Sequence, residues 1–278
     1  MGVYKKYGEV FRGLREQNNI SMSSFGILGI SKATLSNFEL GKSMMGFDKV
    51  LCALEFMGIS LEEFEYFLNN YSENEAKSII NDIEKATFQQ DNSLLLKLYT
   101  NACESKLLII ALAVKSSCIG LSKEEISKML DFFYHIDMWG EKELWLFYTV
   151  IDNFDTYDIL LILEELTRDK NKLLNLEKYS RRFILVCCKA ATVLITRGYR
   201  EYSEHILNRM IMFDHVVTMF QHNVYNFTMG LWEYKFEDKE LGQNLVEASL
   251  KVFKELALPE VFNYYENEFK SLKRSKDI

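Results

Sequence analysis

The stretch Ser31-Lys-Ala-Thr-Leu-Ser-Asn-Phe-Glu-Leu-Gly41 predicts a short amphipathic helix. Serine is a favoured residue before the first helical turn, because its hydroxyl accepts a hydrogen bond from a backbone amide of that turn. Glycine often follows a helix, because it adopts the left-handed backbone conformation without strain. Between these two residues, the apolar side chains recur at helical spacing and form one face, made of Ala33, Leu35 and Phe38.

The residues before this stretch predict a second, shorter helix. Residues 22–25 can form one more helical turn, and the link 28–30 contains Gly29. Two short helices joined by a tight turn with glycine are typical of a helix-turn-helix motif. The second helix of such a pair enters the major groove of DNA, where short polar side chains reach base edges or phosphates. The outer face of this helix carries Lys32, Thr34, Ser36 and Asn37.

A small helical domain is predicted around the motif. Residues 5–18 form an expected helix before it, and two more follow over 47–57 and 60–68. The last of them begins with Ser60 and Glu63, the pattern of a capping box. Residues 1–44 carry six basic and three acidic side chains, a net +3, whereas the whole chain carries −7. A mildly basic head on an acidic body favours contact of the head with DNA.

The rest of the chain predicts helix after helix. It contains the single proline, Pro259, and 48% of all residues in the chain are hydrophobic. Residues 195–207 and 234–246 share an outline at a distance of 39 residues: a long helix, a tight turn and a second helix with a small residue. The small residues, Ser203 and Gly242, are expected where the helices cross closely. Such a period indicates a helical repeat of the tetratricopeptide kind. The expected helices are 74–90, 92–103, 105–117, 122–135, 141–154, 157–167, 179–197, 199–213, 215–235, 239–256 and 259–274.

These patterns together predict an all-α chain in two parts. We expect an N-terminal five-helix helix-turn-helix domain over residues 1–68 and a linker over 69–76. Residues 77–278 are expected to form a C-terminal α-solenoid of degenerate tetratricopeptide-like helix pairs.

The head resembles the phage-repressor-like helix-turn-helix family. Many members of that family open the first helix of the motif with glutamine, which holds a phosphate, whereas this chain has Met22-Ser23-Ser24 there. Phosphate contacts are expected from Arg12, Arg15 and Lys42, and base contacts from the outer face of the second helix. The resemblance rests on Arg15, Ile20-Ser21, Ile30-Ser31-Lys32, Leu35-Ser36, Phe38-Glu39, Gly41-Lys42 and residues 58–64. The predicted DNA-binding residues are Arg12, Arg15, Ser31, Lys32, Thr34, Ser36, Asn37 and Lys42.

Over nearly its whole length, the chain resembles the Rgg-type regulators, also called the GadR/MutR group, of streptococci and related bacteria. The resemblance implies a homodimeric transcription factor whose repeat domain binds a short secreted peptide that has been re-imported, as in quorum sensing. In the body it rests on residues 143–147, Asn153-Phe154, Arg181-Arg182, Phe227 with Gly230-Leu231 and Tyr234, Ala248 with Val252-Phe253, and Glu260 with Tyr264-Tyr265.

A peptide site is expected on the concave surface, which the first helix of each repeat pair lines. These helices are 141–154, 179–197 and 215–235. Amide side chains suit a peptide backbone, since each donates and accepts hydrogen bonds. Arg181 or Arg182 can hold a terminal carboxylate or an acidic side chain. The expected peptide-binding residues are Trp145, Tyr148, Asn153, Arg181, Arg182, His222, Tyr225 and Asn226, with Tyr179 and Trp232 on the same helices.

Enzyme, metal and membrane functions are not predicted. The four histidines stand apart, and neither a metalloprotease motif nor a nucleophile elbow nor a glycine-rich phosphate loop is present. We therefore expect no catalytic residue, metal or cofactor. The five cysteines lack metal-site spacing and lie in apolar surroundings, which predicts buried thiols in a reducing cytoplasm. No apolar run reaches transmembrane length and no signal-peptide pattern opens the sequence, so we expect a cytoplasmic protein.

Two functional hypotheses remain open from the sequence. The first is a sequence-specific DNA-binding transcriptional regulator, with double-stranded DNA, a short signalling peptide, a second copy of the chain and RNA polymerase as partners. The alternative is a peptide-responsive helical-repeat protein that acts by binding a protein partner rather than DNA. The net +3 of residues 1–44 favours the first, and the acidic whole favours the second. Salt dependence separates them, because DNA binding weakens steeply with ionic strength.

Overall fold

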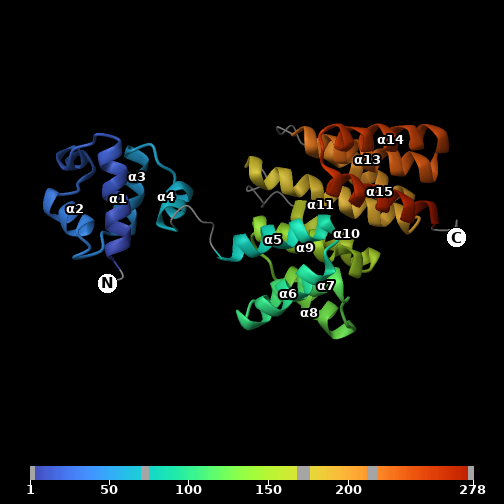
Figure 1. Cartoon of the computed structure of the whole chain (residues 1–278), viewed down its shortest axis with the longest axis horizontal. Helices are drawn as coiled ribbons and strands as arrows, with labels where there is room; N and C mark the ends of the chain where they lie inside the picture. The colour runs from blue at the N-terminus through green and yellow to red at the C-terminus, as the bar shows by residue number, and fades with distance from the viewer. Residues whose placement is uncertain (1–3, 70–74, 168–175, 212–217, 275–278) are drawn as a thin grey trace. The chain divides into compact units, whose positions relative to one another are not determined.

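The computed structural model describes residues 4–69, 75–167, 176–211 and 218–274, and every regular element in these ranges is a helix (Figure 1). The all-α prediction is confirmed. The chain divides into two compact units, Met1–Asn81 and Asp82–Ile278. Most of the predicted linker, residues 70–74, lies outside the described ranges, so the predicted domain boundaries stay a prediction. None of the described helices is long and apolar enough to cross a membrane.

The first unit contains the five predicted helices. They are α1 (Lys5–Gln17), the 3₁₀-helix η1 (Met22–Leu28), α2 (Lys32–Glu39), α3 (Phe47–Phe56) and α4 (Leu61–Leu68). The motif consists of η1 and α2, so its first helix is the tighter 3₁₀ form, and it is longer than the single turn expected. A left-handed residue, Gly29 with φ 69°, follows η1. The predicted capping box is present at α4.

Phenylalanine rings form the centre of this unit. The ring of Phe11 on α1 lies 5.4 Å from that of Phe38 on α2, 6.0 Å from that of Phe25 on η1 and 6.5 Å from that of Phe64 on α4. Aromatic pairs at such distances stabilise beyond the area they bury. The core therefore ties α2 to α1 and η1. The expectation for Ala33 was wrong, because it lies on the exposed side of α2.

The second unit is a series of antiparallel helix pairs. Their observed ends differ from the predicted ones by a few residues, and part of the predicted connection between the helices 199–213 and 215–235 lies outside the described ranges. The elements are α5 (Glu75–Gln89), α6 (Asn92–Glu104), α7 (Leu108–Cys118), α8 (Lys123–Tyr134), α9 (Glu141–Val150), η2 (Ile151–Asn153), α10 (Thr156–Thr167), α11 (Glu177–Thr196), α12 (Arg200–Ile211), α13 (Met219–Phe236), α14 (Lys239–Glu255) and α15 (Pro259–Arg274).

The predicted repeat corresponds to two of these pairs, α11 with α12 and α13 with α14, whose helices lie side by side (Figure 1). At Gly242 an added Cβ would lie 2.2 Å from the backbone nitrogen of Tyr234, so only glycine permits this crossing. Ser203 is completely buried, and its hydroxyl donates to the carbonyl oxygens of Tyr199 and Arg200. Both small residues thus lie at close packing positions, as the repeat predicted.

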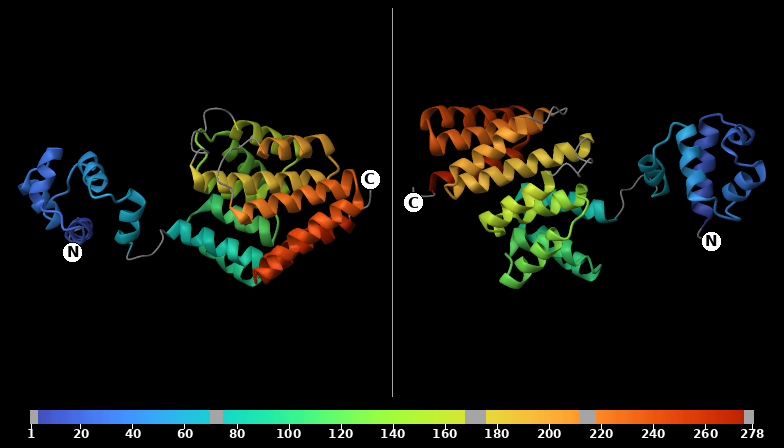
Figure 2. Two further views of the ribbon diagram at one scale, coloured as in Figure 1. Left: turned by 90° about the horizontal axis from the view of Figure 1, so that it is seen from above. Right: turned by 180° about the vertical axis from the view of Figure 1, so that it is seen from behind.

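The last helix of the unit returns to its first. The rings of Phe88, on α5, and Tyr264, on α15, lie 5.2 Å apart, and the side-chain amide of Asn267 donates to that of Gln90 at 3.3 Å. Figure 2 shows α15 running along the same side of the unit as α5. These contacts join the first and the last helix of the unit.

Candidate functional site

The outer face of α2 is polar and accessible. Lys32 and Asn37 are exposed, Ser36 is half-buried, and Lys42 is exposed just after the helix. The Ser31 hydroxyl accepts from the backbone amide of Thr34 at 3.1 Å and lies 2.9 Å from the Thr34 hydroxyl. Ser31 and Thr34 therefore use part of their hydrogen-bonding capacity to begin the helix. The side chains of Lys32, Asn37 and Lys42 are available to a partner.

Arg15 has a different role from the one expected. Its Nε and Nη2 donate to the two carboxylate oxygens of Glu39 at 2.6 and 2.8 Å, and its Nη1 donates to the carbonyl oxygen of Ile20 at 2.9 Å. Arg15 is 7% exposed and Glu39 is 2% exposed. The phosphate contact predicted for Arg15 is therefore replaced by an internal bidentate ion pair. Arg12, by contrast, is exposed and pairs with Glu16 on the surface of α1.

The two serines at the start of η1, where the family usually has glutamine, both form hydrogen bonds with Ser21. The hydroxyls of Ser23 and Ser24 lie 2.8 and 2.9 Å from that of Ser21. Ser23 is exposed, and its hydroxyl oxygen keeps a lone pair that can accept a hydrogen bond. The phosphate-holding amide of the resemblance has no direct counterpart at this position.

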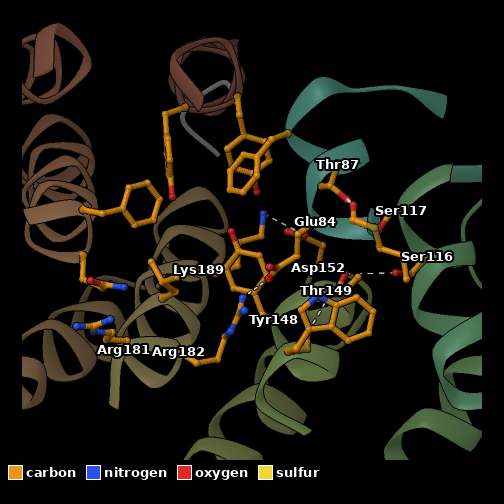
Figure 3. A pocket seen from close by; sticks show the side chains of 18 of the residues that line it. Glu84, Thr87, Ser116, Ser117, Tyr148, Thr149, Asp152, Arg181, Arg182 and Lys189 are labelled. Carbon is orange, nitrogen blue, oxygen red and sulfur yellow. Dashed lines mark hydrogen bonds and ion pairs between the residues drawn. The ribbon is translucent and has the colours of Figure 1, made fainter. Parts of the chain in front are cut away.

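The second unit contains a cavity of about 590 Å³, shown from close by in Figure 3. Its wall comes from alternate helices: α5, α7, α9, α11, α13 and α15 all contribute side chains, together with η2. Ligand sites in proteins commonly have about 300–1,000 Å³. The cavity therefore suits a small molecule or a segment of a short peptide.

The charges that line the cavity are balanced and partly paired. Four acidic side chains (Glu84, Glu141, Asp152, Glu268) face four basic ones (Lys178, Arg181, Arg182, Lys189).

Lys189 forms the centre of the deepest ion-pair group. Its Nζ lies 3.0 Å from a carboxylate oxygen of Asp152 and 3.3 Å from one of Glu268. Burial by itself would lower the pKa of Lys189, but the Glu268 and Asp152 carboxylates outweigh that effect and raise it. Lys189 thus stays charged and links α11 to η2 and to α15. Beside it, burial raises the pKa of the Tyr148 and Tyr264 hydroxyls, so both remain neutral hydrogen-bonding groups.

Hydroxyl side chains gather in another part of the cavity. Those of Thr87, Ser116, Ser117 and Thr149 lie near one another in Figure 3. The hydroxyls of Thr87, Ser116 and Thr149 donate to helix carbonyl oxygens at 2.6–2.9 Å, so their oxygens keep lone pairs that can accept. This part of the wall can therefore receive N–H groups of a ligand, such as the backbone amides of a peptide.

The structure brings together five of the eight predicted peptide-binding residues. Trp145, Tyr148, Asn153, Arg181 and Arg182 all line the cavity, although Trp145 is only 1% exposed and forms part of its wall. The role of these residues in binding stays a prediction.

Three predicted residues of α13 lie elsewhere. His222 is exposed, Tyr225 and Asn226 are half-buried, and none of the three is among the cavity's lining residues. From α13 the lining residues are Phe220 and Gln221. His222 follows Gln221 directly and therefore points about 100° away from it around the helix. Tyr225 and Asn226 lie at least one turn further along α13 than the lining residues.

Sequence reasoning missed the contributions of α5 and α15. Glu84 and Lys189 were not singled out, because each finds its partner 98 or 79 residues away along the chain. The resemblance did include Tyr264-Tyr265, and both tyrosines line the cavity. That pair was the available signal that α15 belongs to the site.

Metal-ligating and thiol side chains do not form a further site in the described part of the chain. No group of three histidine, cysteine, aspartate or glutamate side chains in the described ranges could hold a metal ion. Cys187 and Cys188 are buried, and burial raises the pKa of Cys188 to about 12, as expected for structural thiols. The expectation that all cysteines are buried was wrong, because Cys52 and Cys103 are exposed.

Fold and site together define the class of the protein. A five-helix helix-turn-helix unit precedes, in one chain, a helical-repeat unit whose inner helices surround a ligand-sized cavity.

Comparison with known proteins identifies the family. Residues 75–267 match the family model of the C-terminal domain of the helix-turn-helix-type transcriptional regulator Rgg. That match covers more than half of the chain, so the chain belongs to the Rgg family of transcriptional regulators. The family is one of regulators and not of enzymes.

Solved structures share the fold along the whole chain. The Streptococcus dysgalactiae SHP pheromone receptor Rgg2 is 19% identical, with a TM-score of 0.76, over 99% of this chain and 100% of that one. A Listeria monocytogenes EGD-e protein is 17% identical, with a TM-score of 0.76, over 99% of both chains. PrgX in its complex with cCF10 is 12% identical, with a TM-score of 0.72, over 98% of this chain and 94% of that one.

Proposed function

We propose that this chain is a sequence-specific DNA-binding transcriptional regulator controlled by a short signalling peptide that binds in the cavity. The observation that carries the proposal is the cavity itself, lined by alternate helices inside the part of the chain that matches the Rgg C-terminal domain. Two of the similar structures are described as a pheromone receptor and as a complex with cCF10, which supports a peptide as the ligand class.

The DNA-binding surface in this proposal is the polar face of α2. Two copies of the chain, as a homodimer, would present their α2 helices to successive major-groove segments about one helical turn of DNA apart. Arg12 and Lys42 position the domain on phosphates, while Lys32, Thr34, Ser36 and Asn37 contact bases. Ser31 contributes by starting the helix. The exposure of Lys32, Asn37 and Lys42 supports this assignment.

The peptide would act by changing the relative populations of two states of the homodimer. Its binding free energy must differ between the states for the DNA affinity, or the recruitment of RNA polymerase, to change. The aromatic, hydroxyl and charged parts of the cavity offer a peptide apolar contacts, acceptors for amides and ion pairs. This variety favours a peptide over a purely apolar ligand.

The test is DNA binding by the purified full chain, measured with DNA from upstream of its own and neighbouring genes at two salt concentrations. We expect selective binding that weakens with salt through counterion release. Extract of the native cells, filtered to retain only short peptides, should shift that affinity. If no selective binding occurs at low salt, with or without the filtrate, the DNA-binding function is wrong and the protein-partner alternative takes its place.

Two substitutions test which side chains contact bases and which contact phosphates. Asn37→Ala should relax sequence selectivity, with a cost of about 1–3 kcal/mol on the preferred site, because a base contact is lost. Lys42→Gln should weaken binding to all sequences alike, because only a phosphate contact is lost. Equal effects of both substitutions on all sequences would contradict the assignment.

A further inference from the structure

The cavity contains an ion pair that does not use the full capacity of its arginine. On α11, Nη1 of Arg182 is bonded to Oε1 of Glu84, which lies on α5 (Figure 3). Among the described residues no partner is seen for Nη2 or Nε of Arg182. A guanidinium carries five donors and binds a carboxylate best through two parallel hydrogen bonds. The Arg182 side chain is 17% exposed and that of Glu84 is 26% exposed, so both are reachable from the cavity.

The first unit offers an internal comparison. Arg15 is paired with Glu39 through both carboxylate oxygens, and its third nitrogen donates to a backbone carbonyl. Each of the three guanidinium nitrogens of Arg15 is bonded, and the residue is buried, as a structural group should be. Arg182 differs in each respect: one contact, partial exposure and a position in the wall of a cavity. The difference indicates that Arg182 has capacity for a second carboxylate.

A neighbouring atom supports the same conclusion. Nε of Arg181 is buried, and within the described part of the chain it has no hydrogen-bond partner. Arg181 also lines the cavity, one residue before Arg182. A buried donor without a partner costs free energy, which a ligand acceptor can recover. Two adjacent arginines thus offer unused donors in one part of the cavity wall.

The geometry points to Arg182 as a carboxylate subsite, in which Glu84 occupies the place of the ligand's carboxylate while the cavity is empty. This inference rests on the proposed peptide-binding function and adds the chemistry that the peptide must have. A ligand carboxylate binds Arg182 through two hydrogen bonds and displaces the singly bonded Glu84. Glu84 is then the residue that sets how strongly a carboxylate must bind in order to enter.

Displacement of Glu84 has a direct structural consequence. Glu84 is on α5, and the division between the two units of the chain falls within this same helix, between Asn81 and Asp82. The ion pair to α11 is one of the contacts that hold α5 to the repeat unit. When a ligand carboxylate replaces Glu84 at Arg182, α5 loses this contact with α11, and its attachment to the repeat unit changes.

The test uses three synthetic libraries of octapeptides, all made from uncharged amino acids. The first has a free C-terminal carboxylate, the second a C-terminal carboxamide, and the third a carboxamide with one glutamate at varied positions. Each library is passed over the immobilised full-length protein, and retained peptide is quantified by mass spectrometry. The variants are Arg182→Gln, Glu84→Gln and the double substitution of both. Arg274→Gln, which removes an exposed arginine of α15 outside the cavity, is the matched control.

We expect the wild-type protein and Arg274→Gln to retain the first or the third library above the second. Glu84→Gln should increase that retention roughly tenfold, because the competing carboxylate is gone. Arg182→Gln and the double variant should retain all libraries alike. The library that is preferred shows whether the carboxylate is terminal or in a side chain. The double variant lacks both charges, so its circular dichroism and retention of the second library show that loss of preference is not unfolding.

Three results would overturn the inference or its basis. Equal retention of the three libraries by wild type and Glu84→Gln would remove the carboxylate subsite but leave peptide binding intact. A preference that survives in Arg182→Gln would assign the carboxylate to another group. Failure of every variant to retain any library would remove the proposed peptide function, and the inference with it.

Discussion

At the scale of single residues, Arg15 shows how a charged side chain becomes part of a core. It lies on α1, and its carboxylate partner Glu39 ends α2, so the pair fixes α2 to α1. The side-chain bond to Glu39 is the largest cause that raises the pKa of Arg15, and it outweighs the effect of burial. Taking both charges away from water has a cost, and the pair compensates it only while both partners are present.

Arg15→Ala should therefore destabilise the first unit by about 3 kcal/mol, because it leaves Glu39 buried without its counter-charge. The measurement is urea unfolding of the full chain, followed by circular dichroism. The matched control is Arg12→Ala on the same helix, whose ion pair with Glu16 is exposed, and it should change stability far less. If the two variants unfold at the same urea concentration, the structural role given to Arg15 is wrong.

Glu125 provides a pH dependence with a defined sign. The bond from Lys115 at 2.6 Å, followed by the backbone amide of Ser122, lowers the pKa of Glu125 from 4.5 to about 2. The folded state therefore favours the charged carboxylate. The resulting stabilisation is complete above pH 4.5 and is lost as the pH falls toward about 2.

Glu125→Gln should lower stability at neutral pH and flatten its decline between pH 4.5 and about 2. Glutamine still accepts the Ser122 amide in the capping box, so only the charge effect is removed. Thermal unfolding at a series of pH values is the measurement, with exposed Glu124→Gln as the control. An unchanged acid slope in Glu125→Gln would show that the carboxylate does not contribute to it.

At the scale of elements, α1 and α2 touch through their backbones. A Cβ added at Gly8 would lie 1.9 Å from the carbonyl oxygen of Phe38, a separation that requires the backbone to move. Gly13 lies on the exposed side of the same helix, and a Cβ there meets nothing within 4 Å. Position 8 therefore requires glycine, whereas position 13 has room for a side chain.

Gly8→Ala should destabilise the first unit by about 2–3 kcal/mol, because the motif helix is pushed from α1. Gly13→Ala should instead stabilise it by about 0.5–1 kcal/mol through helix propensity. The stability of both variants is measured as the urea concentration at the midpoint of unfolding. In the proposed function, Gly8→Ala should also weaken DNA binding at a temperature where the fold persists. A Gly8→Ala variant as stable as Gly13→Ala would contradict the close approach of the two helices.

The elements also show what the sequence can and cannot predict. Helix ends followed from local chemistry: Ser31 and the Ser60–Glu63 capping box act within one turn, so their signals are in the nearby sequence. Buried residues of α2 such as Leu35 and Phe38 followed from spacing. The side of α13 that faces the cavity could not be predicted in this way. Apolar and polar side chains are mixed around this helix, so their periodicity indicates no preferred face.

Long-range pairs were equally inaccessible to a sequence-based argument. Glu84 is an ordinary acidic residue of a helix until the fold places it against Arg182, 98 residues later. Arg15 was assigned to phosphate because nothing near it in the sequence indicates its partner Glu39, which lies 24 residues away on α2. Charged residues on amphipathic helices are usually exposed, and pairing across elements is decided only by tertiary packing.

At the scale of the whole molecule, charge is distributed unevenly along the chain. Residues 1–44 carry +3 in a protein of net charge −7. An acidic protein binds DNA only through a local basic surface. The exposed Lys32 belongs to the proposed base-reading face, and the exposed Lys42 lies just after α2. The salt dependence of binding should therefore arise from few contacts, all in the first unit.

Lys42→Gln should reduce the slope of log affinity against log salt by about 1, because one phosphate-neutralising charge is removed. Lys251→Gln is the matched control: its lysine is exposed on α14 of the second unit, where it pairs with Glu255. It changes the net charge of the protein equally but should leave the slope unchanged. The measurement is fluorescence anisotropy with labelled DNA across a salt series. If the two substitutions changed the slope equally, binding would follow net charge, and the localised surface on α2 would be wrong.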